Sequence, residues 1–187
     1  MIKSLTAAAL LLAGAAQAAT VVNVDAMTDS WNSGAGAGLD TGVALTAGQA
    51  FTVTAGADDL WSAGPLPRWS NADGLKADLF ATGSDESGQL AGTLIGQDFG
   101  LLGDFHYGEL VGQIGGGAFF AVGTSFTGTA NASGDLKLFY WDTFTGDNSG
   151  SVAVTVSAVP EPGSVALMLA GLGLVGTLAR RRAKQQG

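Results

Sequence analysis

Residues 151–157 read Ser-Val-Ala-Val-Thr-Val-Ser, the clearest alternation of residue types in the chain. Val152, Val154 and Val156 point to one side of an extended strand, and the small or hydroxyl-bearing residues between them point to the other. This period of two is typical of a half-buried antiparallel strand whose valines face a core. The stretch therefore predicts a β-sheet protein with one face of the sheet buried.

Similar short runs precede this strand and are separated by clusters of Gly, Asn, Asp and Ser. Such clusters are typical of turns between short strands. The pattern predicts an all-β fold, an antiparallel jelly-roll-like β-sandwich, over residues 19–158. Residues 70–106 show the least regular pattern, and we expect an insertion on one rim there. The further strands are expected at residues 21–25, 43–45, 51–54, 92–97, 109–114, 119–122, 125–130 and 136–140.

The first 18 residues have the three parts of a secretory signal peptide. Lys3 supplies a basic start, an apolar alanine-rich run follows over residues 5–16, and Ala16-Gln17-Ala18 places small residues at a cleavage site. An ordinary buried helix is the alternative, but it would need a polar face that this run lacks. We expect a signal peptidase to cut before Ala19.

The last 29 residues, 159–187, form a second distinct segment. Pro160, Glu161 and Pro162 come first, an uncharged stretch follows over about residues 163–179, and a basic tail occupies residues 180–184. The stretch is close to the roughly 20 residues of a transmembrane helix. Basic residues that flank a membrane span stay on the cytoplasmic side, so the preceding domain would face away from the cytoplasm.

This ordered trio of motif, apolar stretch and basic tail resembles the PEP-CTERM sorting signal of Gram-negative bacteria. The resemblance implies a transient anchor in the inner membrane and cleavage near Pro160-Glu161-Pro162 by an exosortase-like enzyme. The protein would then reach the cell surface or the medium, often in organisms that make exopolysaccharide. The alternative is a plain C-terminal tail anchor.

Charge and composition exclude several classes of function for the central domain. Residues 20–158 hold three basic residues (Arg68, Lys76 and Lys137) against fifteen acidic ones, a net charge of −12. Such a domain repels nucleic acid and anionic lipid. The chain has no cysteine, which excludes thiol catalysis and disulfides. His106 is the single histidine and has no catalytic motif around it, so we do not expect an enzyme.

Three patches of the domain, within residues 41–69, 109–124 and 133–157, resemble the PA-I type family of galactose-binding bacterial lectins. The resemblance implies a calcium ion that contacts sugar hydroxyls directly. The matching ligands would be Asp142, Thr145, Asp147, Asn148 and the backbone carbonyl of Ala63. Calcium prefers hard oxygen donors of these kinds. The same residues also suit a simple hairpin connection, because Asp, Asn, Ser and Gly are good turn formers.

The loop from Trp141 to Asn148 is two residues shorter than in that family. Trp61, Trp69 and Trp141 belong to the loops that would frame the ion, where a ring could stack on the apolar face of a sugar. The alternative is that these tryptophans fill the core.

Two functions stay open at this point. The first is an exported surface or matrix protein with a calcium-dependent carbohydrate-binding module for extracellular polysaccharide. The second is a non-catalytic structural or interaction protein of the envelope or biofilm with no sugar site, because a fold does not dictate a function.

Overall fold

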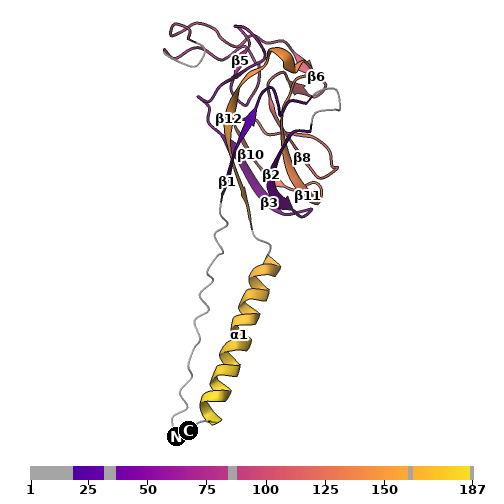
Figure 1. Cartoon of the computed structure of the whole chain (residues 1–187), viewed down its shortest axis with the longest axis vertical. Coiled ribbons are helices and arrows are strands. Elements are labelled where there is room, and N and C mark those ends of the chain that lie inside the picture. Colours follow the sequence, from indigo (N-terminus) through magenta and orange to yellow (C-terminus); the bar gives the residue numbers. More distant parts are fainter. Residues whose placement is uncertain (1–18, 32–36, 84–87, 160–161, 186–187) are drawn as a thin grey trace. The chain divides into compact units, whose positions relative to one another are not determined.

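The computed structural model describes residues 19–31, 37–83, 88–159 and 162–185. The chain divides into two compact units, Ala18–Val159 and a second made of Met1–Gln17 with Pro160–Gly187. All strands among the described residues belong to the first unit (Figure 1). They are β1 (Thr20–Asp25), β2 (Leu39–Leu45), β3 (Ala50–Ala55), β4 (Trp61–Ser62), β5 (Trp69–Ser70), β6 (Leu101–Leu102), β7 (Phe105–His106), β8 (Leu110–Ile114), β9 (Phe120–Ala121), β10 (Ser125–Thr129), β11 (Gly134–Tyr140) and β12 (Ser149–Ala158).

The strand that contains the valine alternation, β12, organises the larger sheet. It pairs antiparallel with β1 along one edge and with β3 along the other, and the sheet runs β10-β3-β12-β4-β5 with β1 off this path. The register places Val156 opposite Thr20 on one side and opposite Val53 on the other. The first and last strands of the domain are therefore neighbours (Figure 1).

The second sheet has the order β2-β11-β8-β9 and is also antiparallel. Its inward residues join those of the first sheet in one apolar core, to which β12, β3, β8 and β11 all contribute. Val152, Val154 and Val156 are at most 1% exposed. Burying a valine side chain stabilises the fold by about 1.5–3 kcal/mol, so this stretch contributes strongly. The prediction of an antiparallel β-sandwich is confirmed.

Most of the predicted strands form within a few residues of their expected bounds, but residues 92–97 are a correction. This segment makes isolated bridges at Leu94 and Gly96 and no strand. Gly92 turns the chain with φ +82°, in the left-handed region that favours glycine. Ile95 is buried in a small separate cluster with Leu60 and Ala81. The buried apolar side chain of Ile95 is therefore explained by local packing and not by a position in a β-sheet.

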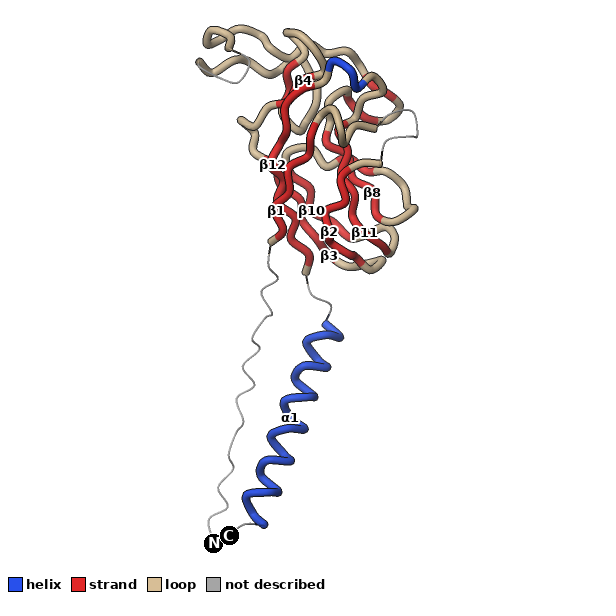
Figure 2. Tube along the Cα trace, in the orientation of Figure 1, coloured by secondary structure: helices blue, strands red, loops and turns tan. Residues whose placement is uncertain are grey.

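The described residues of the irregular segment 70–106 lie among the loops that gather near β4 at one end of the sandwich (Figure 2). It carries the two-stranded β6–β7 hairpin, in which Leu101 pairs with His106. The described loops here are held by backbone hydrogen bonds, such as the one from the Leu75 N–H to the Tyr107 carbonyl at 2.8 Å. These loops supply one wall of the pocket described below.

The second unit contains the helix α1 (Pro162–Gln185). Proline suits the first turn of a helix, because the N–H it lacks would have no partner there. Among the residues that the structure describes, no helix is both long and apolar enough to cross a membrane, so the span predicted at about residues 163–179 is not confirmed. The predicted signal peptide (residues 1–18) and the motif residues Pro160 and Glu161 lie outside the described residues.

Candidate ligand-binding pocket

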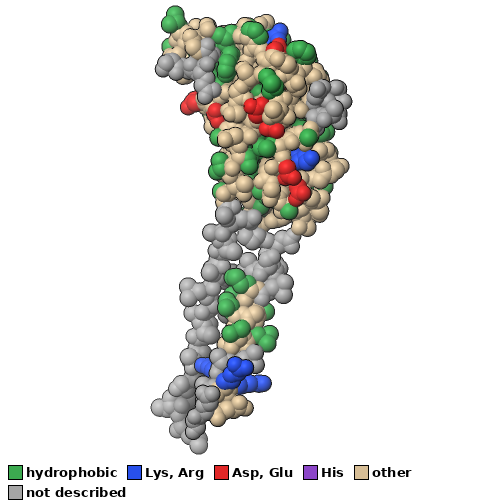
Figure 3. All heavy atoms as spheres, in the orientation of Figure 1, with side chains coloured by type: hydrophobic (Ala, Val, Ile, Leu, Met, Phe, Trp, Pro, Cys, Tyr) green, Lys and Arg blue, Asp and Glu red, His purple; other side chains and the backbone are tan. Residues whose placement is uncertain are grey.

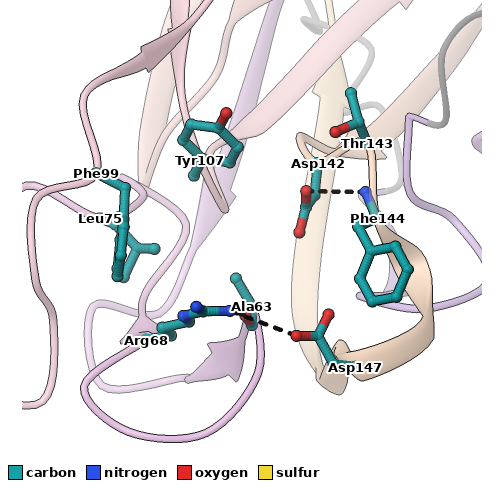
Figure 4. A pocket seen from close by; sticks show the side chains of 9 residues that line it. All are labelled: Ala63, Arg68, Leu75, Phe99, Tyr107, Asp142, Thr143, Phe144 and Asp147. Atoms are coloured by element: carbon teal, nitrogen blue, oxygen red, sulfur yellow. Dashed lines mark hydrogen bonds and ion pairs between the residues drawn. The ribbon is translucent and has the colours of Figure 1, made fainter.

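A cavity of about 300 Å³ opens between the β4–β5 hairpin and the loop that joins β11 to β12. Its polar lining comes from Arg68, Asp142, Thr143 and Asp147, and its apolar lining from Ala63, Leu75, Phe99, Tyr107 and Phe144. Figure 4 shows Arg68, Leu75 and Phe99 on one side and Asp142, Phe144 and Asp147 on the other. The volume is at the lower end of the range for small-molecule sites.

The β11–β12 loop is fixed by contacts with the segment after β1. Ser30 Oγ donates to the Asp142 carbonyl at 3.0 Å, and Asn148 Nδ2 donates to the Ala26 carbonyl at 3.0 Å. Trp141 stacks on Trp31 with 4.4 Å between ring centroids. A short 3-10 helix, η1 (Thr145–Asp147), then turns the chain into β12. These contacts hold in place the loop that carries Asp142 and Asp147.

Asp142 is buried, with 6% of its surface exposed, although it lines the cavity. Its Oδ1 accepts a hydrogen bond from the Phe144 N–H at 3.1 Å. Burial raises the pKa of this carboxyl above its ordinary value, and the negative charge of Asp147 raises it further. Backbone N–H groups of the loop and the Asn148 side chain act in the opposite direction. The site therefore contains a carboxylate that is poorly compensated in its charged form.

The opposite wall is built by the β4–β5 hairpin. Arg68 Nη1 donates to the Ala63 carbonyl at 3.3 Å and to Asp147 Oδ2 at 3.4 Å. The guanidinium also lies over the Phe99 ring, 5.2 Å from its centroid. Gly64, with φ +112°, makes the close approach possible, because a Cβ at this position would lie 2.6 Å from Asp147 Oδ2. Arg68 thereby joins the hairpin to the β11–β12 loop across the cavity (Figure 4).

The predicted calcium ligands are only partly brought together. Asp142, Asp147 and Ala63 line the pocket, whereas Thr145 and Asn148 do not. Asn148 is 1% exposed; its Nδ2 is bonded to Ala26, while its Oδ1 has no hydrogen-bond partner. The described residues contain no group of three or more His, Cys, Asp or Glu side chains suited to a metal ion.

The donors as arranged do not fit a calcium cage. Calcium takes about six to eight oxygen ligands at roughly 2.3–2.6 Å. Two of the five predicted donors, the Ala63 carbonyl and the Asp147 carboxylate, instead accept from Arg68 Nη1. The unpartnered Asn148 oxygen is the feature of the described loop that favours an ion. Calcium binding at this loop stays a prediction from the resemblance.

The tryptophans predicted for sugar stacking do not line the cavity. Trp61 is fully buried, edge-on to Tyr140, and its Nε1 donates to the Gly108 carbonyl at 2.9 Å. Trp141 is 5% exposed and is stacked on Trp31, and Trp69 is half-buried against the Ile95 cluster. The rings that do line the cavity are Phe99, Tyr107 and Phe144.

Sequence reasoning misses these three rings and Arg68. Phe99 lies within the segment with the weakest pattern and Tyr107 directly follows it, while the contact between Arg68 and Asp147 spans 79 positions in the chain. One available signal is the rarity of basic residues, since Arg68 is one of three in residues 20–158.

Comparisons with known proteins bear first on the C-terminal segment. Residues 158–183 match the family model described as the PEP-CTERM protein-sorting motif. The chain therefore carries a PEP-CTERM sorting signal, which implies an exported protein.

Among solved structures, the chain is similar to one described as "EclA N-terminal domain; PllA-like lectin". The two are 24% identical with a TM-score of 0.48, and the likeness covers 74% of this chain and 94% of that chain. No curated protein matches the chain.

Proposed function

We propose that this exported protein is a non-catalytic carbohydrate-binding module whose pocket takes a neutral, hydroxyl-rich saccharide of the extracellular matrix. One observation supports this above the others. Two carboxylates and a guanidinium line a single cavity together with exposed aromatic rings. Saccharides present hydroxyl groups and apolar C–H faces side by side, so a binding site needs both kinds of surface.

The polar groups supply complementary hydrogen bonds. The carboxyl oxygens of Asp142 and Asp147 accept from hydroxyl groups, and the guanidinium of Arg68 donates to hydroxyl or ring oxygens. Charge-assisted hydrogen bonds of this kind are roughly twice as strong as neutral ones. The saccharide would thus be held through its hydroxyl pattern.

The aromatic groups supply the stacking surface. Phe144 is 67% exposed and Phe99 is 42% exposed, so both rings present apolar area that a ligand can cover. A large exposed apolar side chain beside a cavity is characteristic of binding sites.

The charge of the domain narrows the ligand class. The pocket holds two acidic side chains and one basic one, on a domain with a net charge of −12. Figure 3 shows acidic side chains over the visible face of the sandwich and few basic ones. Anionic polymers would be repelled, so a neutral polysaccharide is the expected partner.

The sorting signal supplies the location. We expect signal peptidase to remove residues 1–18, a transient anchor in the inner membrane, and processing by an exosortase-like enzyme at Pro160-Glu161-Pro162. Replacement of these three residues by alanine should retain the protein in the cell envelope. Unchanged release of the variant into the medium would contradict the sorting role.

A glycan array tests the binding proposal. The purified full chain should bind a subset of neutral glycans, and Asp147→Asn should bind them more weakly while keeping its melting temperature. Absence of binding to any neutral glycan would leave the structural or interaction protein without a sugar site as the better description.

A further inference from the structure

Arg68 occupies an unusual position for a basic residue in this domain. Of the three basic residues in residues 20–158, it is the one that lines the pocket. Its Nη1 lies within 3.4 Å of both the Ala63 carbonyl and the Asp147 carboxylate. These are two of the oxygens that the lectin resemblance assigns to a divalent cation. The positively charged guanidinium of Arg68 therefore lies where it contacts both of these oxygens.

The local structure of the β4–β5 hairpin fixes the position of the Arg68 side chain. The Ala63 N–H donates to the Arg68 carbonyl at 3.0 Å, which closes the six-residue loop between β4 and β5. The Phe99 ring supports the guanidinium from one side. Gly64 leaves room for the pair, since a side chain there would collide with the Asp147 carboxylate. The loop hydrogen bond, the Phe99 ring and Gly64 thus favour the same placement of Arg68.

We propose that the Arg68 guanidinium is the resident cation of this pocket, in place of a divalent metal ion, and that it bridges Ala63 to Asp147. Saccharide binding, which rests on the function proposed above, is then independent of metal. The planar guanidinium carries five N–H donors, and only Nη1 is used in the contacts with Ala63 and Asp147. The others can donate to ligand oxygens.

The charge of a guanidinium gives this arrangement a distinct chemistry. Arginine stays protonated at every physiological pH, and a chelator cannot remove it. A calcium ion offers empty coordination positions, whereas arginine offers hydrogen atoms in a fixed plane. The pocket would accordingly select ligands by the direction of their acceptor oxygens.

Thermal unfolding of the purified full chain tests the cation directly, without any sugar. The melting temperature of the wild type should be the same in millimolar calcium and in a chelator. Arg68→Gln frees the Ala63 carbonyl and Asp147, so this variant should melt lower in the chelator and gain stability when calcium is added. The double variant Arg68→Gln/Asp147→Asn should lose that gain, because it removes the carboxylate.

The conservative variant Arg68→Lys separates a cation role from simple packing. Lysine keeps the charge but not the planar fork, so Arg68→Lys should suppress the calcium response that Arg68→Gln acquires. A calcium-induced rise in the wild type would overturn the proposal. Equal calcium responses of the wild type and Arg68→Gln would also overturn it, because Arg68 would then not occupy a cation position.

The affinity for glycan, measured in the presence of the chelator, is the second test of the role of Arg68. The wild type should keep its affinity there, and Arg68→Gln should lose most of it. Loss of wild-type binding in the chelator would overturn the metal-free site. If no glycan binds under any condition, the proposed function fails, while the calcium titrations still decide the role of Arg68.

Discussion

Two loop carboxylates of this domain, Asp73 and Asp147, each lie beside a glycine in the sequence but have opposite environments. Asp73 follows β5 and is closed in by Thr124, whose N–H donates to Oδ1 at 2.7 Å and whose Oγ1 donates to both carboxylate oxygens. Asp147 has a long contact with Arg68 at 3.4 Å, and its side chain is 33% exposed. The carboxylate of Asp73 is used in hydrogen bonds within the fold, whereas the carboxylate of Asp147 faces the cavity.

The difference separates acids that stabilise loops from acids that are available to a ligand. Each satisfied hydrogen bond to a charged group contributes about 1.5–3 kcal/mol. An exposed ion pair contributes about 0–1 kcal/mol. Stability should therefore depend on Asp73, and ligand affinity on Asp147.

The largest effect should come from Asp73→Ala. Loss of the contacts with Thr124 should lower the free energy of unfolding by about 2 kcal/mol, because the Thr124 N–H loses its partner. Chemical denaturation measures this change. Affinity for the glycan should be unchanged, since Asp73 does not line the pocket, and a loss of affinity in the folded variant would break the comparison.

Asp147→Asn should show the reverse behaviour. We expect about a tenfold loss of affinity, equivalent to about 1.4 kcal/mol, because the amide replaces a charged acceptor. The free energy of unfolding should change by less than about 1 kcal/mol. Isothermal titration calorimetry and denaturation, run on the same preparation, check the two parts. A destabilisation as large as that of Asp73→Ala would erase the distinction.

Phe144→Ala should reduce affinity by roughly fivefold, since stacking on an aromatic ring contributes about 1 kcal/mol. Its ring is 67% exposed, so the melting temperature should not fall. Leu90→Ala is the matched control, because Leu90 is 83% exposed and does not line the cavity. Equal effects of the two substitutions on affinity would remove Phe144 from the site.

The smallest effect concerns the pH dependence of stability through Asp142. Burial raises its pKa above the ordinary value, so the folded state binds this proton more tightly than the unfolded state. The contribution of Asp142 to the free energy of unfolding is therefore fully present below the ordinary aspartate pKa. It is lost as the pH rises through the raised pKa that Asp142 has in the folded state. Asp142→Asn removes that loss.

Denaturation of the wild type and Asp142→Asn at a series of acidic to neutral pH values measures the difference. The variant should gain stability relative to the wild type as pH rises, although it binds the glycan more weakly. A relative loss over the same interval would show that the charged form of Asp142 is favoured by the fold.

The sequence predicts long strands well and short ones poorly, for a physical reason. Alternation over residues 151–157 is enforced by burial of one face, and β12 forms there with two further residues before it and one after it. The two-residue strands β4 to β7 are too short to show a period. The strand predicted at residues 92–97 is wrong because Ile95, the buried apolar residue of that segment, packs in a local cluster with Leu60 and Ala81.

The pocket can be predicted in part. Asp142, Asp147 and Ala63 follow from the resemblance, and all three line one cavity. The inward positions of Asn148 and Trp141 depend on partners 122 and 39 positions away, respectively. No local pattern encodes contacts over such distances. The same applies to Arg68, whose importance arises only when the hairpin meets the β11–β12 loop.

Strand β12 has a mechanical consequence as well. Asp147 lies just before its first residue, Ser149, and the sorting segment follows its last, so one strand of ten residues, about 33 Å long, connects the pocket to the tail. Tension between a polymer held in the pocket and a tethered tail would run along this strand. Because β1 and β3 flank it, their hydrogen bonds would be loaded together in shear and would not unzip one at a time.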